Sequence, residues 1–391
     1  MITSLRIKNF KSLKDISLRL GRRTILVGPN MGGKSNLISV FRFLSQLVQG
    51  APGVQGLAQA VNNQGGFAAM AWSGGESNVI TFGMEGVMEG SDGGFPWRYS
   101  LDLLGDRSKG LVTIQEERLT GRFGNSEIAL LETNHATGRR VIRRVSGETV
   151  TEVDDVRRSG LEFEIPDWEG NRLRQSFSSF QFFTLVPLVM KQVNPTSAPS
   201  FLTETGNNLS SWLMTLQTRH SHEYASLASA LRDVFPEILD LSTWPTPQAT
   251  VFLTSNERHL KLPVPMSQMS DGELCFIALL SLLFAPKELG APLYCIEEPE
   301  NHLHPRMLKV LIELHDQRQR ELGDRAAQLL ATTHSPFFVD QVDIADVVMV
   351  SKRDGATCCV RPSDKPHLRE ILANEEIGLG DLVYSGALAD D

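Results

Sequence analysis

The sequence predicts an α/β protein in which a mixed or parallel sheet is interrupted by a β-rich insertion and a helical lobe. The first observation is a strand, a glycine-rich loop and a helix in direct succession over residues 24–41. The second is a long middle region whose short strands are separated by Gly-Gly, Asp-Gly and Gly-Asn turn signals. The third is the return of alternating strands and helices after Thr250, which is typical of a sheet covered by crossover helices.

Hydrophobic periodicity divides the 391 residues into four segments. The expected boundaries are 1–48 for the first part of the core, 49–184 for the β-rich insertion, 185–250 for the helical lobe and 251–391 for the second part of the core. Strands are expected at 4–7, 16–18, 24–27, 79–84, 97–103, 111–118, 140–145, 292–296 and 328–333. Helices are expected at 36–41, 207–235 and 274–284, where apolar residues recur at helical spacing.

The composition is that of an ordinary globular chain, with 41% hydrophobic residues. Lys and Arg number 38 against 46 Asp and Glu, so the net charge of −8 gives no overall electrostatic reason to bind nucleic acid or an anionic membrane. Cys275, Cys295, Cys358 and Cys359 lack C-x-x-C spacing and predict reduced thiols. Because the sequence has no signal-peptide or membrane-spanning apolar stretch, we expect a cytoplasmic protein without a membrane partner.

The glycine-rich loop fits a known phosphate-binding pattern. Residues Gly28–Ser35 spell Gly-Pro-Asn-Met-Gly-Gly-Lys-Ser, which satisfies the P-loop motif at every required position. In such a loop the glycines let backbone N–H groups surround the phosphates, the lysine reaches the β and γ oxygens, and the hydroxyl ligates Mg²⁺. The residues expected to bind a nucleoside triphosphate are Asn30, Gly32, Gly33, Lys34 and Ser35, with Ser35 also a metal ligand. A chance glycine-rich turn is the alternative, which the flanking strand and helix disfavour.

Acidic residues follow the strand predicted at 292–296. Glu297 and Glu298 come at its carboxyl end, where ligands bind in an open α/β sheet. Two adjacent carboxylates are costly to bury unless a cation offsets their charge. We therefore expect Glu297 to hold Mg²⁺ and Glu298 to polarise the attacking water, with a solvated acidic turn as the alternative. His334 follows the strand at 328–333 in the same way, and a satisfied core histidine is its simpler interpretation.

The sequence Ser270-Asp271-Gly272-Glu273 precedes the apolar helix expected at 274–284. Its simplest interpretation is a capping box, in which the serine and the glutamate satisfy backbone N–H groups of the first turn. A capped helix N-terminus with a glycine for close approach is also suited to an anion such as a γ-phosphate. Both interpretations can hold at once.

The order of these motifs resembles the ABC-type ATPases of the SMC/RecF/OLD group, and within it the stand-alone ATPases often labelled AAA15/AAA21. The motifs that carry the resemblance are 28–35, 270–273, 296–305 and 333–336, together with an opening segment at 5–12 and a closing segment at 379–386. The resemblance covers residues 1–48 and 205–388. It implies a P-loop ABC-type ATPase head with a helical lobe that carries the signature motif.

The resemblance implies a role for each motif, assigned by matching positions in the sequence. Ser270 and Gly272 are the signature that contacts ATP bound to a second copy of the chain, so dimerisation would complete the active sites. Glu297 is the Walker B acid, Glu298 the catalytic base and His334 the switch histidine, with ATP and Mg²⁺ as cofactors. Glu297 stands where the family usually has Asp, and Ser-Asp-Gly-Glu replaces the Ser-Gly-Gly-Gln of transporters.

Three further polar residues are assigned through the resemblance. Gln64 is the expected Mg²⁺-sensing glutamine after the P-loop helix, with Gln55 and Gln59 as alternatives. His302 and His304 belong to a segment that shapes the dimer-facing loop. A zinc site there is rejected because no third ligand lies at metal spacing.

Missing features narrow the function. No long heptad-bearing coiled coil or C-x-x-C hook is present, and the stretch after His334 is expected to be too short for the Toprim nuclease domain of OLD enzymes. The resemblance implies an ATPase switch or motor for a separately encoded nuclease or toxin in bacterial antiphage defence. The alternative is a RecF-like DNA-binding ATPase in repair or recombination, which gene neighbourhood would distinguish. A transport ATPase is disfavoured by the insertion and the signature.

Arginines cluster in the insertion despite the negative net charge. On one strand Arg139 and Arg143 would share a face, while Arg140 and Arg144 would lie on the other. With the pair at 157–158, they could form a DNA-binding surface, an effector-docking surface or a solvated hairpin.

Overall fold

The computed structural model describes residues 1–50, 55–88, 94–153, 157–323, 326–365 and Gly380. Its described residues form two compact units. The first unit contains residues from 1–180 and 344–365, and the second contains residues from 181–343 together with Gly380. Apart from Gly380, the closing segment expected at 379–386 lies outside the described residues.

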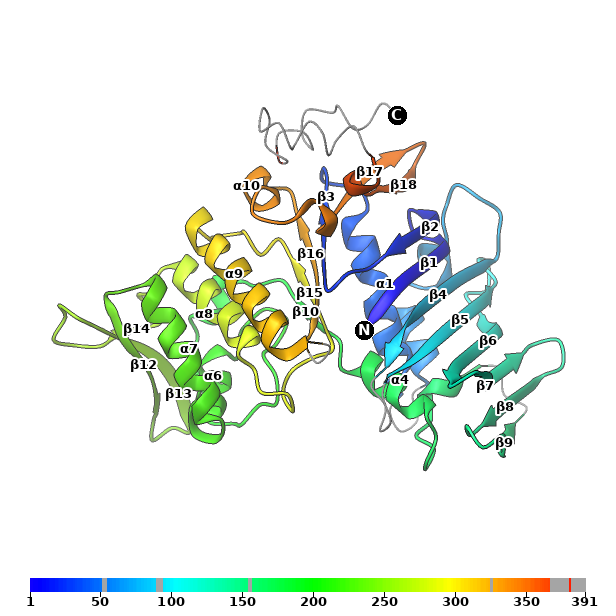
Figure 1. Cartoon of the computed structure of the whole chain (residues 1–391), viewed down its shortest axis with the longest axis horizontal. Coiled ribbons are helices and arrows are strands. Elements are labelled where there is room, and N and C mark those ends of the chain that lie inside the picture. The colour runs from blue at the N-terminus through cyan, green and yellow to red at the C-terminus, as the bar shows by residue number, and fades with distance from the viewer. Residues whose placement is uncertain (51–54, 89–93, 154–156, 324–325, 366–379, 381–391) are drawn as a thin grey trace. The chain divides into compact units, whose positions relative to one another are not determined.

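An antiparallel sheet dominates the first unit and is seen in blue to green in Figure 1. In the part of the chain that the structure describes, its strands follow the order β2 (Leu13–Arg19), β1 (Ile2–Phe10), β4 (Val79–Met88), β5 (Phe95–Gly105), β6 (Val112–Phe123), β7 (Ser126–Asn134), β8 (Arg139–Arg143) and β9 (Thr149–Val153). Along β5, buried side chains alternate with exposed or half-buried ones. This alternation is the pattern of a sheet with one face in the core.

Helices and aromatic rings cover the buried face of this sheet. Phe43 of α1 (Lys34–Leu47) stacks on Phe82 of β4 with ring centroids 4.9 Å apart. Phe177 of α4 (Gly170–Ser178) meets Tyr99 of β5 edge-on at 5.7 Å. Two shorter helices, α2 (Gly56–Asn63) and α3 (Phe67–Met70), also belong to this unit. The P-loop helix α1 is therefore anchored by large apolar contacts to the sheet.

A second group of strands in the first unit carries the P-loop. Strand β3 (Arg23–Val27) is buried at all five positions and runs parallel to β17 (Val347–Arg353), with Val347 opposite Ile25. Strand β17 turns back antiparallel into β18 (Ala356–Val360). A strand that is buried on both faces is typical of the interior of a parallel sheet. The chain leaves β3 through residues 28–33 and enters α1 at Lys34.

Parallel strands also form the centre of the second unit. Strand β15 (Leu293–Glu297) pairs in parallel with β10 (Gln181–Phe183) and with β16 (Gln328–Thr333). The helices of this unit are α5 (Pro187–Met190), α6 (Leu209–Arg219), α7 (Ser221–Val234), α8 (Asp271–Leu283), α9 (Pro305–Leu322) and α10 (Pro336–Val339). Helix α8 is buried at most positions, and its Ser281 hydroxyl accepts a hydrogen bond from the Trp212 indole of α6 at 2.9 Å.

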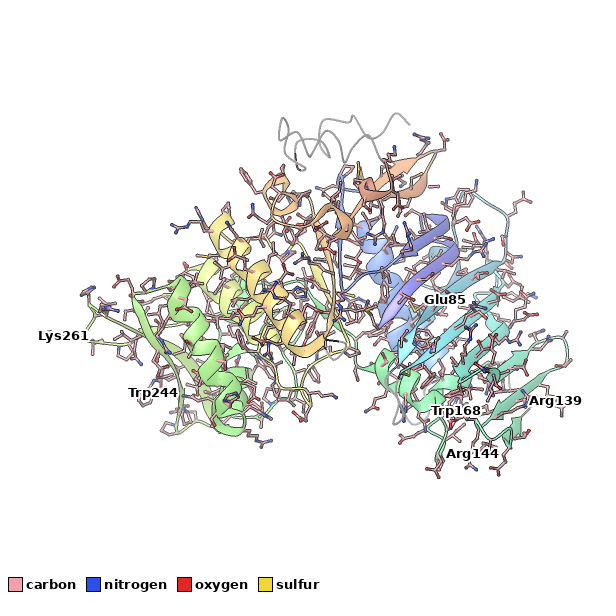
Figure 2. All side chains as sticks on the ribbon, viewed as in Figure 1. Glu85, Arg139, Arg144, Trp168, Trp244 and Lys261 are labelled. Atoms are coloured by element: carbon pink, nitrogen blue, oxygen red, sulfur yellow. The ribbon has the colours of Figure 1, made fainter. Side chains whose placement is uncertain are left out.

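A small antiparallel sheet completes the second unit. Its strands are β11 (Asn194–Pro195), β13 (Thr250–Glu257), β12 (Ile238–Pro245) and β14 (Val264–Pro265). The Tyr224 hydroxyl of α7 donates to the Leu241 carbonyl of β12 at 2.6 Å, which ties the helices to this sheet. Figure 2 shows Trp244 on β12, where its indole donates to the Thr254 hydroxyl of β13.

The compact units do not follow the four segments expected from the sequence. The strands of segment 49–184 continue the sheet begun by β1, because β4 pairs antiparallel with β1 and places Met84 opposite Leu5. Strands β12 and β13 pair across the boundary expected at residue 250. No helix among the described residues is long and apolar enough to cross a membrane.

Candidate active site

Close backbone packing requires the glycines of the P-loop. A Cβ on Gly28 would lie 1.9 Å from the Val350 carbonyl oxygen of β17, and one on Gly32 would lie 2.9 Å from the same atom. Gly33 has a φ of 111° and precedes α1 as its N-cap. Any side chain at these positions would push the loop away from β17 or strain its backbone. The expected glycines are thus fixed by the fold of the first unit.

The P-loop lysine is folded onto its own loop. The Lys34 ammonium donates to the Gly28 carbonyl at 2.6 Å and to the Pro29 carbonyl at 3.1 Å, and the residue is 6% exposed. The neighbouring Asn30 and Ser35 are exposed. A cation held against the loop, beside an exposed hydroxyl, is the donor set that phosphate oxygens and Mg²⁺ require.

A network of hydroxyl groups, which the sequence analysis did not predict, forms hydrogen bonds with the P-loop and with α1. The Thr357 hydroxyl of β18 donates to the Gly32 carbonyl at 3.0 Å and lies 2.6 Å from the Ser12 hydroxyl. The Asn36 amide of α1 donates to the same Ser12 hydroxyl at 2.6 Å. Ser12 belongs to the opening segment quoted for the resemblance, whereas nothing in the local sequence around Thr357 signals this contact.

Gln64, the expected metal-sensing glutamine, forms the C-cap of α2. Its backbone N–H donates to the Val61 carbonyl at 3.1 Å. Among the described residues, no side-chain hydrogen bond joins Gln64 to the P-loop. The structure therefore places Gln64 in the first unit with the P-loop, and its role as a metal ligand stays a prediction.

In the second unit, the paired glutamates end β15 as the sequence predicts. Glu297 is the last residue of β15 and lies opposite Thr332 of β16. Glu298 follows with a φ of 48°, and its backbone N–H donates to the Thr332 carbonyl at 3.0 Å. This hydrogen bond ties the turn after β15 to β16, so both carboxylates start from a fixed backbone.

Two neighbours hold the Glu298 carboxylate. Its Oε1 lies 3.1 Å from His334 Nδ1, and its Oε2 accepts a hydrogen bond from the Asn301 side-chain amide at 3.0 Å. His334 comes directly after β16, as the sequence predicts, and its side chain is 46% exposed. The structure thus brings Glu298 and His334 together. Asn301 lies in the quoted 296–305 segment, but sequence reasoning gave it no role.

A third glutamate of the same turn is buried. The Glu300 side chain is 10% exposed, and its Oε1 accepts hydrogen bonds from the Thr333 hydroxyl at 2.5 Å and from the His334 backbone N–H at 3.2 Å. Burial raises the pKa of the Glu300 carboxyl above its ordinary value, while these hydrogen bonds act in the opposite direction. Sequence reasoning assigned Glu300 no function, although it was the third carboxylate in the segment.

The capping box at α8 is present. The Ser270 hydroxyl accepts from the Glu273 N–H at 3.2 Å, and the Glu273 carboxylate accepts from the Ser270 N–H at 2.7 Å. A Cβ on Gly272 would lie 2.6 Å from the His302 carbonyl oxygen. Gly272 is therefore required for the close approach of the turn after β15 to α8.

Charged side chains flank this helix N-terminus. The Lys191 ammonium lies 2.7 Å from Asp271 Oδ1, and His302 Nδ1 lies 3.9 Å from Asp271 Oδ2. The Lys191 hydrogen bond lowers the pKa of Asp271, and the charges of Lys191 and His302 act in the same direction. Lys191 thus offsets the charge of Asp271, one of two carboxylates in the first turn of α8. His304 caps the next helix, because its ring accepts from the Arg306 N–H at 3.3 Å.

Comparison with known proteins gives one family. A family model described as "AAA domain, putative AbiEii toxin, Type IV TA system" matches residues 23–340. No curated protein sequence matches the chain. Among solved structures, the SMC head bound to the C-winged helix domain of ScpA is similar with a TM-score of 0.54 at 15% identity, covering 92% of this chain and 96% of that chain.

A second SMC head domain, from Thermotoga maritima, gives a TM-score of 0.47 at 14% identity and covers 92% of this chain and 98% of that chain. The fold rests on the first of these structures. It confirms the predicted α/β fold of an ABC-type P-loop ATPase head.

Proposed function

Because the chain belongs to the family of AAA domains whose model spans residues 23–340, we propose that it is a Mg²⁺-dependent ATP hydrolase that dimerises around ATP. We propose further that it acts as a switch or motor for a separately encoded effector, a nuclease or toxin, in bacterial antiphage defence. The observation that carries the hydrolase is the Glu298 carboxylate, held between His334 and Asn301 at the carboxyl end of β15.

The residues of the P-loop and of β15 fit ATP and Mg²⁺. In the first unit, Lys34 and the loop N–H groups would hold the phosphates, and the exposed Ser35 hydroxyl is an oxygen ligand of the kind that Mg²⁺ prefers. In the second unit, the Glu297 carboxylate is a ligand of the same kind, and its assignment to the same ion rests on the family resemblance alone. When bound, Mg²⁺ would offset the charge of the phosphate oxygens. Glu297 carries one more methylene than the Asp usual in the family, which keeps a carboxylate ligand but moves it by about one bond length and so bears on the Mg²⁺ geometry.

Glu298 is the residue best arranged to accept a proton from water. A general base needs an acceptor oxygen that is held in a fixed orientation, and a neighbouring polar group that stabilises the charge of the base. The Asn301 amide fixes Oε2, and the His334 imidazole lies beside Oε1. The imidazole would stabilise the carboxylate and, by its exposure, remain accessible to a phosphate oxygen. These contacts support Glu298 as the base and His334 as the switch residue.

The signature supports a composite site made by two copies. The Ser270 and Glu273 side chains cap the N-terminus of α8, and Gly272 lets the turn that carries His302 pack directly against this end of the helix. Lys191 reduces the negative charge of Asp271 at that end. A helix N-terminus of this kind favours a negatively charged group, as a γ-phosphate presented by the second copy would be.

The arginine cluster favours an effector over the RecF-like alternative. Arg140 is buried, while Arg143 and Arg144 each lie 2.6 Å from a glutamate carboxylate, of Glu132 and Glu148 respectively. Figure 2 shows Arg139 and Arg144 near the two ends of β8. Arginines neutralised by neighbouring glutamates contribute little to a phosphate-binding surface. The family description names the domain itself as a putative toxin, which favours a defence role over DNA repair and says nothing of a separate effector.

The hydrolase is tested by replacing Glu298 with Gln. We expect turnover to fall by about 10²- to 10⁴-fold, while ATP affinity stays near wild type because the P-loop is unchanged. The variant should accumulate as an ATP-dependent dimer in size-exclusion chromatography. Glu313→Gln is the matched control, since that glutamate is exposed on α9. Equal turnover of the two variants would refute the assignment.

The effector is tested with the protein of the neighbouring gene. We expect this protein to co-purify with the ATP-trapped Glu298→Gln variant. The co-purification should be lost when Lys34 is replaced by Ala. DNA binding is titrated with salt in parallel. Steeply salt-dependent DNA binding without co-purification would support the repair ATPase instead.

A further inference from the structure

Glu300 is a buried carboxyl group without a function in the proposed reaction. Its Oε1 accepts two hydrogen bonds, and its Oε2 is buried without a hydrogen-bond partner among the described residues. Buried polar groups are nearly always satisfied, so an unpaired carboxylate oxygen next to an active site calls for an explanation. A glutamine or an apolar residue would fill the same space at a lower cost of desolvation.

The two hydrogen bonds of Glu300 fix the backbone from which His334 projects. The Thr333 hydroxyl donates to Glu300 Oε1 and itself accepts from the Ser335 N–H at 2.9 Å. The His334 N–H between them donates to the same Glu300 oxygen. The last residue of β16 and the residue after it are thereby tied directly to one carboxyl oxygen, and Ser335 is tied to it through the Thr333 hydroxyl. The direction in which the His334 side chain leaves the strand follows from this arrangement.

The His334 imidazole is only partly covered by its surroundings. The His334 side chain is 46% exposed, and the contact of its Nδ1 with Glu298 Oε1 at 3.1 Å is the closer of its two carboxylate contacts. The other is Glu300 Oε1 at 3.9 Å. An exposed ring with one close polar contact depends on its backbone for orientation, and a displacement of about 1 Å can cost about a hundredfold in rate.

We propose that Glu300 is a positioning residue, whose buried carboxyl oxygen fixes the Thr333–Ser335 backbone and so holds the His334 imidazole against Glu298. The inference rests on the proposed ATP hydrolysis. It assigns Glu300 no direct contact with the nucleotide. The acceptor oxygen is the part of the side chain that matters, so an amide in its place retains the function.

The test compares three substitutions in the full chain. Glu300→Ala removes the acceptor and should lower kcat about ten- to hundredfold with little change in KM for ATP. Glu300→Gln keeps an acceptor oxygen and should stay within about threefold of wild type. Thr333→Val removes one donor while keeping the shape, and it should lower kcat by a smaller factor than Glu300→Ala. If Glu300→Ala does not fold, the Gln and Val variants still decide the matter.

A double substitution identifies the route of the effect. If Glu300 acts through His334, then Glu300→Ala combined with His334→Ala should be no slower than His334→Ala alone. Full additivity of the two losses, or equal losses for Glu300→Ala and Glu300→Gln, would overturn the inference. Glu298→Gln separates this failure from that of the proposed function. If the wild type hydrolyses ATP and Glu298→Gln does not, normal turnover of Glu300→Ala refutes the positioning role alone.

Discussion

Replacing Lys34 with Ala tests the nucleotide site, because the contacts of Lys34 allow the change in unfolding temperature to be predicted with and without ATP. The ammonium donates to the Gly28 and Pro29 carbonyls and is 6% exposed. In the free protein, the loss of these hydrogen bonds is offset by removing a buried cation. We therefore expect the unfolding temperature without ATP to change by no more than about 2 °C.

With ATP the loss is much larger, because a charge-assisted contact to phosphate has no substitute in alanine. A hundredfold rise in Kd corresponds to about 2.7 kcal/mol. At an ATP concentration about 100 times the wild-type Kd, ligand binding stabilises the wild type by about 2.7 kcal/mol and the variant by about 0.4 kcal/mol. For 391 residues the unfolding entropy is about 0.8 kcal/mol per degree, so the ATP-induced shifts are about 3 °C and about 0.5 °C.

The assay is thermal unfolding with and without Mg²⁺-ATP, accompanied by equilibrium titration with a fluorescent nucleotide. Lys309→Ala is the matched control, since that lysine is exposed on α9. It should retain the full ATP-induced shift. A wild-type shift and wild-type affinity in Lys34→Ala would show that residues 28–35 do not bind the nucleotide as argued.

Two further predictions concern α8 and the turn after β15. Gly272→Ala should keep ATP affinity but lose the ATP-dependent dimer, because its Cβ would lie 2.6 Å from the His302 carbonyl oxygen. The control is Gly83→Ala, whose Cβ meets only ordinary contacts at 3.5 Å. An ATP-dependent dimer in both variants would contradict the composite site. The raised pKa of Glu300 means that the folded state binds this proton more tightly than the unfolded chain, so the stability from this group is full below its ordinary pKa of 4.5 and is lost as pH rises through the folded pKa. Glu300→Gln should therefore gain stability relative to wild type in denaturant unfolding as the pH rises above 4.5, whereas parallel pH curves would exclude a buried ionising carboxyl group.

Local patterns predicted the elements that are bounded by clear turns. The strand expected at 328–333 has the same bounds as β16, and the strand, loop and helix around Gly28–Ser35 are present. Strand β7 escaped prediction because Leu130 and Leu131 are both buried, and a bulge at Leu130 of β7 breaks the alternation. Strand β9 carries no large apolar side chain in the sequence Thr-Val-Thr-Glu-Val. The long-range pairing of β4 with β1 has no local signal, so the continuous sheet could not be predicted from periodicity.

The predicted arginine faces were confirmed only in part. Arg139 and Arg143 lie on the side of β8 opposite the buried Arg140 and Ile142, as alternation requires. Arg144 lies beyond the end of β8, after a register shift between Ile142 and Arg143, so it does not share the face of Arg140 by strand geometry. Ion pairs decide whether such residues are available to a partner, and they depend on neighbouring strands rather than on sequence spacing.

The residues of the candidate site also fall into those that local motifs predicted and those that they did not. Those predicted from local motifs lie at strand ends and helix starts, where the chain itself sets the geometry. Thr357 and Lys191 were missed because each acts on a partner brought near by tertiary folding. Asn301 acts on Glu298 in the same turn, and this contact was missed because it depends on the positive φ of Glu298, which the sequence does not signal. Glu300 was open to prediction as a third carboxylate in the segment, but its burial was not, since nothing in the sequence shows that Thr333 would cover it.

The turn after β15 explains why these contacts occur together. Glu298 and His302 both have positive φ, at 48° and 69°, a conformation that costs a non-glycine residue about 1–2 kcal/mol each. The turn keeps this strain because the Asn301 N–H donates to the Glu298 carbonyl at 3.0 Å and the Asn301 amide holds the Glu298 carboxylate. At one end the strained backbone aims a carboxylate at His334, and at the other it sets the His302 carbonyl against Gly272. Relaxing either residue to an ordinary conformation would therefore break a contact with the base or with the signature helix, so the strain at this turn is part of the geometry of the candidate site.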